Sequence, residues 1–310
     1  MERSLSGVLV PAVTPFDRQL APNETLFVAY CRWLLERGAH GLAVFGTTSE
    51  ATSLALSERQ HLLERLVAAG VPPAKLLPGT GLCALPESVA LTRHAVGLGC
   101  AGVLMLPPFY YKNVADDGLV AAYSETIERV GDSRLRVYLY HIPQMSGVPL
   151  GLGVIERLLR KYPDTVVGVK DSSGNWEGTK AILAAFPQMI VFPATESRLV
   201  EGMALGAAGC ISASANMNIT MIRALIDAIR AKDSSAGAMQ IRVGAVRQAM
   251  EKVPVIAAVK ALFAHATGGA GWSVVRPPLT PLVTPMLASL RQELAQAGFD
   301  EGRAFAGLPH

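Results

Sequence analysis

Short apolar runs alternate with longer amphipathic stretches over the first two thirds of the chain. The runs are almost continuously hydrophobic, which is typical of parallel strands covered on both faces of a sheet. The predicted strands are Gly7–Val13, Gly41–Phe45, Lys75–Thr80, Ala101–Leu106, Leu135–Ile142, Thr165–Lys170, Met189–Pro193 and Gly209–Ala213.

Between these runs, apolar residues recur with the helical period. The predicted helices are Asn23–Arg37, Ser57–Ala69, Pro86–Leu98, Ala115–Val130, Leu152–Lys161, Asn175–Ala185 and Glu196–Leu205. This alternation predicts an α/β protein, a (β/α)8 TIM barrel. A doubly wound sheet is the alternative, but that fold favours a glycine-rich turn after its first strand. Residues Pro11–Asp17 contain no glycine.

The last third of the chain has helical periodicity without further predicted strands. The helices expected there are Ile219–Ala231, Ala236–Met250, Val255–Ala266 and Pro281–Ala297. The first of them is interpreted as the eighth barrel helix. We therefore expect a barrel catalytic domain over residues 1–225 and a C-terminal helical extension over residues 226–310.

Composition narrows the class of protein. Of 310 residues, 50% are hydrophobic and 17% are charged, and the mean hydropathy is +0.32. These values exclude intrinsic disorder and suffice for a large core. The net charge of +3, from 28 basic and 25 acidic residues, indicates neither a nucleic-acid partner nor an anionic membrane.

The cysteines and the N-terminus indicate a cytoplasmic location. The cysteines are scattered and form no CxxC pair, which argues against a zinc site or a disulfide scaffold; they are Cys31, Cys83, Cys100 and Cys210. The N-terminus lacks the pattern of a signal peptide, because Pro11 and Pro15 interrupt its short apolar stretch. No apolar run approaches the roughly 18 residues of a membrane helix.

In a barrel, chemistry is carried by polar residues at the ends of strands. Lys170 closes the apolar strand Thr165–Lys170. Burial disfavours the charged form of a lysine, and a neutral amine can form a Schiff base with a carbonyl compound. A lysine whose head group reaches solvent is the alternative. Lys260 competes for the role, although its helical surroundings favour a structural ion pair.

Tyr140 is the second candidate. Alternation along the strand puts Tyr138 and Tyr140 on one face and His141 on the other. A phenol at a strand end can pass a proton to and from a substrate oxygen. Packing and hydrogen bonding are the structural alternative for both tyrosines, and His141 is interpreted as structural.

The third candidate is the segment Gly46–Glu50, which follows the second predicted strand. Its consecutive hydroxyls suit a carboxylate, although such loops also serve as helix caps. The glycine-rich stretch Gly206–Gly209 suits either a phosphate or close packing. No metal-binding motif is present, and Asp171 alone forms no site, so we expect no metal and no other cofactor.

These three sites, in this order, resemble the pyruvate-dependent class I aldolases, the family of dihydrodipicolinate synthase and N-acetylneuraminate lyase. The resemblance extends from Gly7 to about Asn216, and the helical tail agrees with it. It is carried by Gly46-Thr47-Thr48-Ser49-Glu50, Pro108-Phe109-Tyr110-Tyr111, Tyr140-His141-Ile142-Pro143 and Gly168-Val169-Lys170-Asp171-Ser172-Ser173-Gly174.

The resemblance implies a role for each matching residue. Lys170 would form the imine with pyruvate or another 2-oxo acid, and Tyr140 would shuttle the proton. Thr47 and Thr48 would hold the carboxylate, and Thr47 would also relay to Tyr140. Ile211 would lie against the pyruvate. Tyr110 resembles a tyrosine that reaches into a neighbouring subunit's site, which implies a homotetramer built as a dimer of dimers.

Departures from the family pattern concern the second substrate. Met145 stands where the synthases carry a carboxylate-binding arginine, and a thioether cannot make that contact. Ser49 replaces a frequent glycine, so the loop conformation is expected to differ. Glu196, followed by Ser197, stands where the sialic-acid lyases have an acidic pair that binds sugar hydroxyls. Further specificity candidates are Lys112, Ser172 and Ser173.

We therefore expect a lyase that condenses pyruvate with an aldehyde or cleaves the corresponding product through Lys170. Dehydration of a 2-keto-3-deoxy sugar acid begins from the same imine and stays an alternative, as does 4-hydroxy-tetrahydrodipicolinate synthesis. A non-catalytic 2-oxo-acid-binding protein would need a broken catalytic set, whereas Lys170, Tyr140 and the threonine pair are all present. A metal- or phosphate-dependent barrel enzyme would need ligands that the motifs do not supply.

Overall fold

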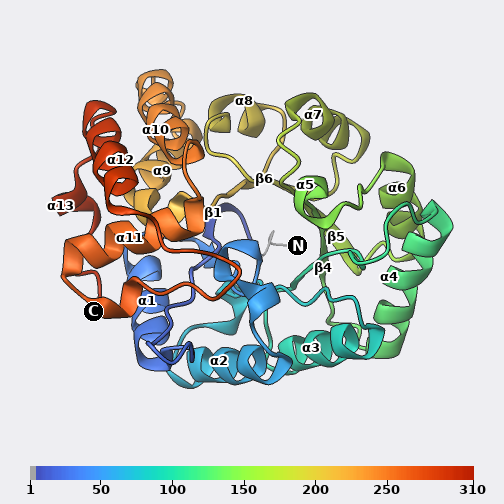
Figure 1. Cartoon of the computed structure of the whole chain (residues 1–310). Coiled ribbons are helices and arrows are strands. Elements are labelled where there is room, and N and C mark those ends of the chain that lie inside the picture. Colours follow the sequence, from blue (N-terminus) through green and yellow to red (C-terminus); the bar gives the residue numbers. More distant parts are fainter. Residues whose placement is uncertain (1–4) are drawn as a thin grey trace.

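The computed structural model describes residues 5–310 and is a barrel of parallel strands surrounded by helices (Figure 1). The strands are β1 Gly7–Val10, β2 Gly41–Leu42, β3 Val103–Met105, β4 Val137–His141, β5 Val166–Asp171, β6 Ile190–Pro193 and β7 Gly209–Ile211. They form the parallel arrays β2-β1-β7 and β3-β4-β5-β6. The expected (β/α)8 class is confirmed.

The helices cover the outside of the strands. They are α1 Glu24–Glu36, α2 Leu56–Ala68, α3 Leu85–Gly97, α4 Asp116–Val130, α5 Pro143–Ser146, α6 Leu152–Lys161, α7 Trp176–Ala185, α8 Leu199–Ala204, α9 Ala215–Arg230, α10 Ala236–Glu251, α11 Val255–Thr267, α12 Thr284–Gln296 and α13 Glu301–Ala304. Figure 1 looks down the ring, with α10 to α13 beside α1 and α9. Among the described residues, no helix is long and apolar enough to cross a membrane.

The predicted third strand, Lys75–Thr80, pairs with both of its neighbours without forming a regular strand. Leu76 bridges Leu42, and Gly79 bridges Leu104. Lys75 belongs to a 3₁₀ turn, and Pro78 has no N–H to donate to a ladder, so pairing is interrupted. The segment still joins the two arrays on one side.

The second join closes the ring between β6 and β7. Ala208 N donates to Val191 O at 2.9 Å. Gly209 of β7 lies so close to β1 that an added Cβ would fall 1.9 Å from Gly7 O. Within the stretch Gly206–Gly209, Gly209 therefore serves close packing at the start of β7, at the opposite end of the strand from the polar residues discussed below.

The core has an inner and an outer layer. The inner cluster fills the barrel, and the outer cluster lies between strands and helices; the inner one comprises Leu5, Leu9, Ala43, Leu77, Leu104, Tyr138, Phe192, Ala208 and Ile211. Inward-facing side chains stack in layers in such barrels. Tyr138 is fully buried among them, so Tyr140, two residues further along β4, lies one layer nearer the carboxyl ends of the strands.

The C-terminal helices pack on the barrel rather than extending away from it. Helix α9 contacts β1 and α10, and α10 contacts α8 and α12. Helix α9 also runs across position 225, so the division into residues 1–225 and 226–310 does not coincide with the end of a helix. That division remains our proposal, and residues 1–4 of its first part lie outside the described residues.

Candidate active site

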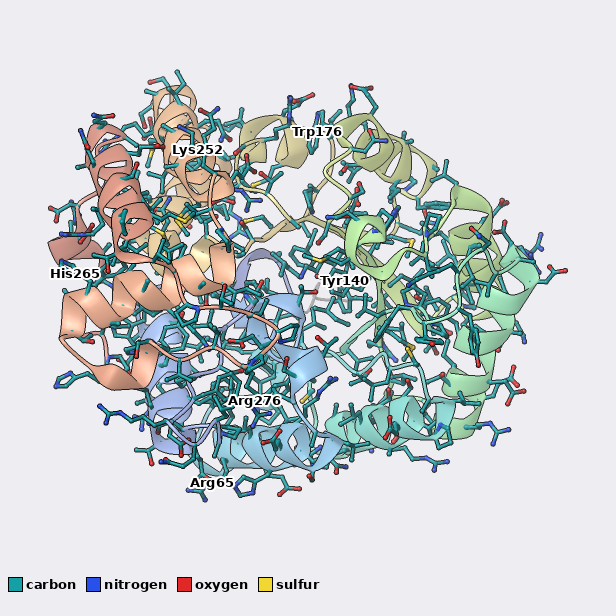
Figure 2. The ribbon with its side chains drawn as sticks, viewed as in Figure 1. Arg65, Tyr140, Trp176, Lys252, His265 and Arg276 are labelled. Carbon is teal, nitrogen blue, oxygen red and sulfur yellow. The ribbon has the colours of Figure 1, made fainter. Side chains whose placement is uncertain are left out.

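A cavity of about 490 Å³ opens at the carboxyl ends of the strands. Its inner part is lined by Thr47, Thr48, Tyr140, Lys170 and Ile211. These residues come from four separate regions of the sequence, and the barrel brings them together. Ser172 and Met145 also line the wall. Figure 2 shows Tyr140 pointing into the central region of the ring.

The register of two neighbouring strands places the lysine beside the phenol. Tyr140 of β4 is paired with Lys170 of β5, and Lys170 Nζ lies 4.2 Å from the centroid of the Tyr140 ring. Only 3% of Lys170 is exposed. Its amine is therefore enclosed and lies against the phenol ring.

A bulge in β4 and β5 makes this pairing possible. Val137 pairs with Val166, but Tyr138 pairs with Gly168, so the register shifts by one residue. Gly168 is needed at this point, because an added Cβ would lie 2.4 Å from the Tyr138 ring and 2.5 Å from Ile190 O. The GVKD motif thus contributes a packing residue as well as the lysine.

Thr47 completes a short hydrogen-bonded chain. Its Oγ1 lies 3.1 Å from the Tyr140 hydroxyl. Burial raises the pKa of Tyr140, but the charge of Lys170 and hydrogen bonds from nearby side chains outweigh it. Those hydrogen bonds involve Thr47, Lys170 and Ser172, and the pKa of the phenol is lowered overall. A phenol in this state gives up a proton more readily than a free tyrosine.

The loop Gly46–Glu50 is fixed from two sides. The Ser49 hydroxyl donates to Ala12 O at 2.6 Å, and the Thr14 hydroxyl donates to Ser49 O at 2.8 Å. Ser49 has no positive φ, whereas Glu50 has a φ of 56°. The left-handed residue is thus Glu50, and position 49 needs no glycine.

Lys260 of α11 is the buried partner of this loop. Its Nζ contacts Glu50 Oε1 and donates to Val274 O at 2.8 Å. Burial lowers the pKa of Lys260 to about 8, although the charge of Glu50 acts against that shift. Lys260 does not line the cavity. The ion-pair interpretation of this lysine is confirmed, and it ties the threonine loop to the C-terminal helices.

Other predicted residues lie at the edge of the cavity or outside it. Asp171 lines the wall, but its carboxylate accepts hydrogen bonds from Thr179 Oγ1 and Ser173 N, which fixes the loop after β5. Lys112 donates to Ser146 O at 2.6 Å and does not line the cavity. Tyr110 is 75% exposed and also lies outside the cavity.

Glu196 lies behind the cavity wall and is fully buried. Its carboxylate accepts hydrogen bonds from the hydroxyls of Ser212 and Ser214. Nη1 of Arg247 lies 3.6 Å from Glu196 Oε2. The residue that faces the cavity at this point is Arg247, so a substrate would meet the arginine before the glutamate.

Sequence reasoning missed Arg247, which reaches the cavity from α10. The buried face of this helix contains Val243, Val246 and Met250. Arg247 follows Val243 by four positions and precedes Met250 by three, so it shares their face. The signal in the sequence that could have identified Arg247 was therefore a charged residue within the apolar face of this helix.

His141 points away from the chemistry. Burial lowers the pKa of its imidazole, with Asp171 acting in the opposite direction. His141 does not line the cavity, while its backbone carbonyl accepts a 2.7 Å hydrogen bond from Ser172 N. This agrees with a structural role. Among residues 5–310, no three histidine, cysteine or acidic side chains are grouped as metal ligands would be.

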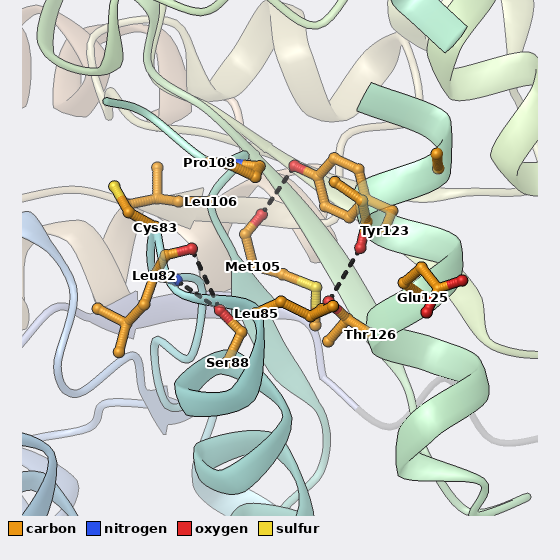
Figure 3. A pocket seen from close by; sticks show the side chains of 12 residues that line it. Leu82, Cys83, Leu85, Ser88, Met105, Leu106, Pro108, Tyr123, Glu125 and Thr126 are labelled. Atoms are coloured by element: carbon orange, nitrogen blue, oxygen red, sulfur yellow. Dashed lines mark hydrogen bonds between the residues drawn. The ribbon is translucent and has the colours of Figure 1, made fainter. Parts of the chain in front are cut away.

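Two smaller cavities adjoin the barrel. One shares Thr47, Tyr140 and Met145 with the main cavity and is otherwise mostly apolar. The other lies between α3 and α4 and is shown in Figure 3. Its wall contains the Tyr123 hydroxyl, which donates to Met105 O at 3.2 Å. Lys170, Thr48 and Ser172 line neither of these smaller cavities.

Comparison with known proteins places this arrangement in a family. The model of the Dihydrodipicolinate synthetase family matches residues 4–297. A DapA-like lyase of Chloroflexus aurantiacus is 33% identical, with 92% of this chain and 94% of that protein covered. The chain belongs to the dihydrodipicolinate synthetase family. The expected family is confirmed, and with it the expectation of an enzyme of the class I lyase type.

Solved structures with the same fold include a dihydrodipicolinate synthase and a sialic acid aldolase. The dihydrodipicolinate synthase of Agrobacterium tumefaciens has a TM-score of 0.86 at 30% identity, covering 94% of this chain and 99% of that one. The sialic acid aldolase of Ruminococcus gnavus has a TM-score of 0.83 at 22% identity, covering 96% and 99%. The second likeness concerns the fold alone.

Proposed function

We propose that this member of the dihydrodipicolinate synthetase family is a Schiff-base aldolase acting on pyruvate or another 2-oxo acid. One observation carries the proposal. The enclosed Nζ of Lys170 lies 4.2 Å from the centroid of the Tyr140 ring, and the Tyr140 hydroxyl is hydrogen-bonded to Thr47. Amine, phenol and hydroxyl thus surround the inner end of a cavity large enough for two substrates.

The reaction begins with attack of the Lys170 amine on the keto carbon. Loss of water gives a protonated imine, which withdraws electrons from the adjacent carbon. Removal of a proton there gives an enamine that adds to an aldehyde, and hydrolysis returns the free lysine. Tyr140 carries the protons, while Thr47 and Thr48 hold the carboxylate of the 2-oxo acid. Cleavage is the same sequence in reverse.

The second substrate is an aldehyde in this proposal, and its chemistry depends on the outer wall. Met145, at the position where synthases have an arginine, is 69% exposed and lines the cavity without supplying a charge. This disfavours 4-hydroxy-tetrahydrodipicolinate synthesis, because the carboxylate of its second substrate needs a cationic side chain to bind it. We therefore prefer aldol cleavage or condensation.

We also propose that the protein is a homotetramer and works in the cytoplasm. Tyr110 and Tyr111 are 75% and 73% exposed and their rings contact each other at 5.5 Å. Exposed aromatic residues are enriched at protein interfaces. In a dimer, Tyr110 would reach the partner's cavity. Analytical ultracentrifugation of the wild type and of Tyr110→Ala tests this: we expect a tetramer that the substitution weakens, and a monomeric wild type would contradict it.

Borohydride trapping tests the chemistry. The protein is incubated with pyruvate and sodium borohydride, and the adduct is located by intact-protein and peptide mass spectrometry. We expect a reduced pyruvyl adduct on the peptide that contains Lys170, absent from Lys170→Ala and retained in Lys260→Arg. No adduct in the wild type, or an adduct on Lys260, would contradict the proposal.

A further inference from the structure

The main cavity extends well beyond the space that pyruvate fills. Its volume of about 490 Å³ compares with roughly 30 Å³ for each water molecule in the liquid, so it holds far more than a three-carbon acid. The outer part is lined by Gln144, Trp176, Ser197, Arg198, Arg247, Gln248 and Glu251. If Lys170 holds the 2-oxo acid, these residues surround the second substrate.

Arg247 is the most firmly held polar group of this outer wall. Its Nη1 donates to Ser212 Oγ at 2.7 Å, and its Nε donates to Glu251 Oε1 at 2.7 Å. Glu196 lies behind it, fully buried. These contacts fix the plane of the guanidinium group, since a fork of donors held at two atoms has little rotational freedom.

One nitrogen of that group is available to a ligand. Within residues 5–310, Nη2 of Arg247 donates no hydrogen bond, although 19% of the side chain is exposed and the residue lines the cavity. A guanidinium that is oriented by two of its nitrogens and open at the third is preorganised to donate to an oxygen atom of a substrate.

The surrounding charges favour a neutral oxygen over a second carboxylate. Arg247 lies between Glu196 and Glu251, so two carboxylates already balance its charge. The other arginine of the outer wall, Arg198, is paired with Glu201 at 3.2 Å. Asp171 adds a third acidic residue to the cavity wall. In the outer part of the cavity, a ligand carboxylate would therefore meet like charges without finding an arginine that is not already paired.

From this geometry we infer that Arg247 is a specificity-determining residue that donates from Nη2 to a hydroxyl of an uncharged, hydroxylated aldehyde. The same contact holds the corresponding hydroxyl of the product in the cleavage direction. Gln144 and Gln248, both on the outer wall, supply further donors and acceptors. The inference rests on the proposed aldolase function, because it assigns the second substrate of that reaction.

The test compares three aldehydes with pyruvate as the common donor: glyceraldehyde, propanal, which lacks the hydroxyls, and succinic semialdehyde, which carries a carboxylate. The wild type is expected to prefer glyceraldehyde. In Arg247→Met, kcat/KM for glyceraldehyde should fall about 10- to 100-fold, the range for one lost hydrogen bond to a charged group. The kcat/KM of Arg247→Met for propanal should change less than about threefold.

A second variant covers the case in which Arg247→Met fails to fold. Arg247→Lys keeps a cation beside Glu196 and Glu251 but lacks the open nitrogen, so it should lose selectivity for glyceraldehyde in the same direction. The matched control is Arg242→Met, which lies on the same helix outside the main cavity and should leave all three values unchanged.

The outcomes separate this inference from the proposed function. Absence of a pyruvate adduct on Lys170 in the wild type would overturn the proposed aldolase function itself. An intact adduct with equal losses for glyceraldehyde and propanal in both Arg247 variants would make Arg247 a positioning residue only. A wild-type preference for succinic semialdehyde, or turnover of none of the three aldehydes, would overturn the assignment of a neutral hydroxylated substrate.

Discussion

Lys170 and Tyr140 are partners in the register of two adjacent parallel strands, with Nζ of the lysine 4.2 Å from the centre of the phenol ring. They are thirty positions apart in the sequence. The distance between them is set by the backbone ladder of β4 and β5 rather than by flexible loops. Side chains on strands are held more precisely than side chains on loops, which suits a proton transfer beside an imine.

Replacing Tyr140 by Phe should reduce kcat about 10²- to 10⁴-fold, the usual contribution of a positioned general acid or base. The ring remains to pack against Lys170, so pyruvate trapping on that lysine should persist. Steady-state kinetics and borohydride trapping measure the two effects separately. Tyr162→Phe, outside the cavity, is the control. Equal kcat values for Tyr140→Phe and the wild type would exclude the phenol from proton transfer.

Removing the Thr47 hydroxyl should move the pH dependence of the reaction. The hydrogen bond from Thr47 helps to lower the pKa of Tyr140, so Thr47→Val should raise that pKa. A limb of the pH profile that reports ionisation of the phenol should then shift to higher pH. Thr47→Ser keeps a hydroxyl and should leave the limb nearly in place. A shift to lower pH in Thr47→Val would show that the coupling has the opposite sign.

Gly168→Ala should destabilise the fold by about 1–3 kcal/mol, the usual effect of overpacking a core. The new methyl group would lie 2.4 Å from the Tyr138 ring. Gly244→Ala is the matched control, because an added Cβ there meets no atom within 4 Å and alanine suits a helix interior better by about 0.5–1 kcal/mol. Urea unfolding measures both. Equal stability of the two variants would mean that the bulge relaxes without cost.

Lys260→Met should cost about 3–5 kcal/mol, because it leaves the buried carboxylate of Glu50 without its cation. Adding Glu50→Gln should restore part of the loss, and the double-mutant cycle isolates the interaction. Chemical denaturation of the four proteins provides the measurement. If the second substitution restores nothing, the charge of Glu50 is compensated by other groups, such as Arg276 N, which donates to it at 2.9 Å.

Much of the architecture could be predicted because each strand and helix carries its own periodic signal. The prediction of a regular strand was wrong where one residue interrupts the hydrogen bonds between strands, as Pro78 does in the predicted strand Lys75–Thr80. The observed helix α8, Leu199–Ala204, is also shorter than the expected helix Glu196–Leu205. Glu196 lies in the preceding loop, where burial with two serine hydroxyls removes it from the cavity surface.

By itself, the sequence determined the alternation of strands and helices and the residue types available for imine chemistry. Hydrophobic periodicity is local, so it needs no knowledge of distant contacts. The tertiary structure decided which side chains share the cavity. Closure of the barrel brings Thr47, Tyr140 and Lys170 together, and α10, which follows the last strand, adds Arg247. Such contacts depend on strand register and helix docking, which no local pattern encodes.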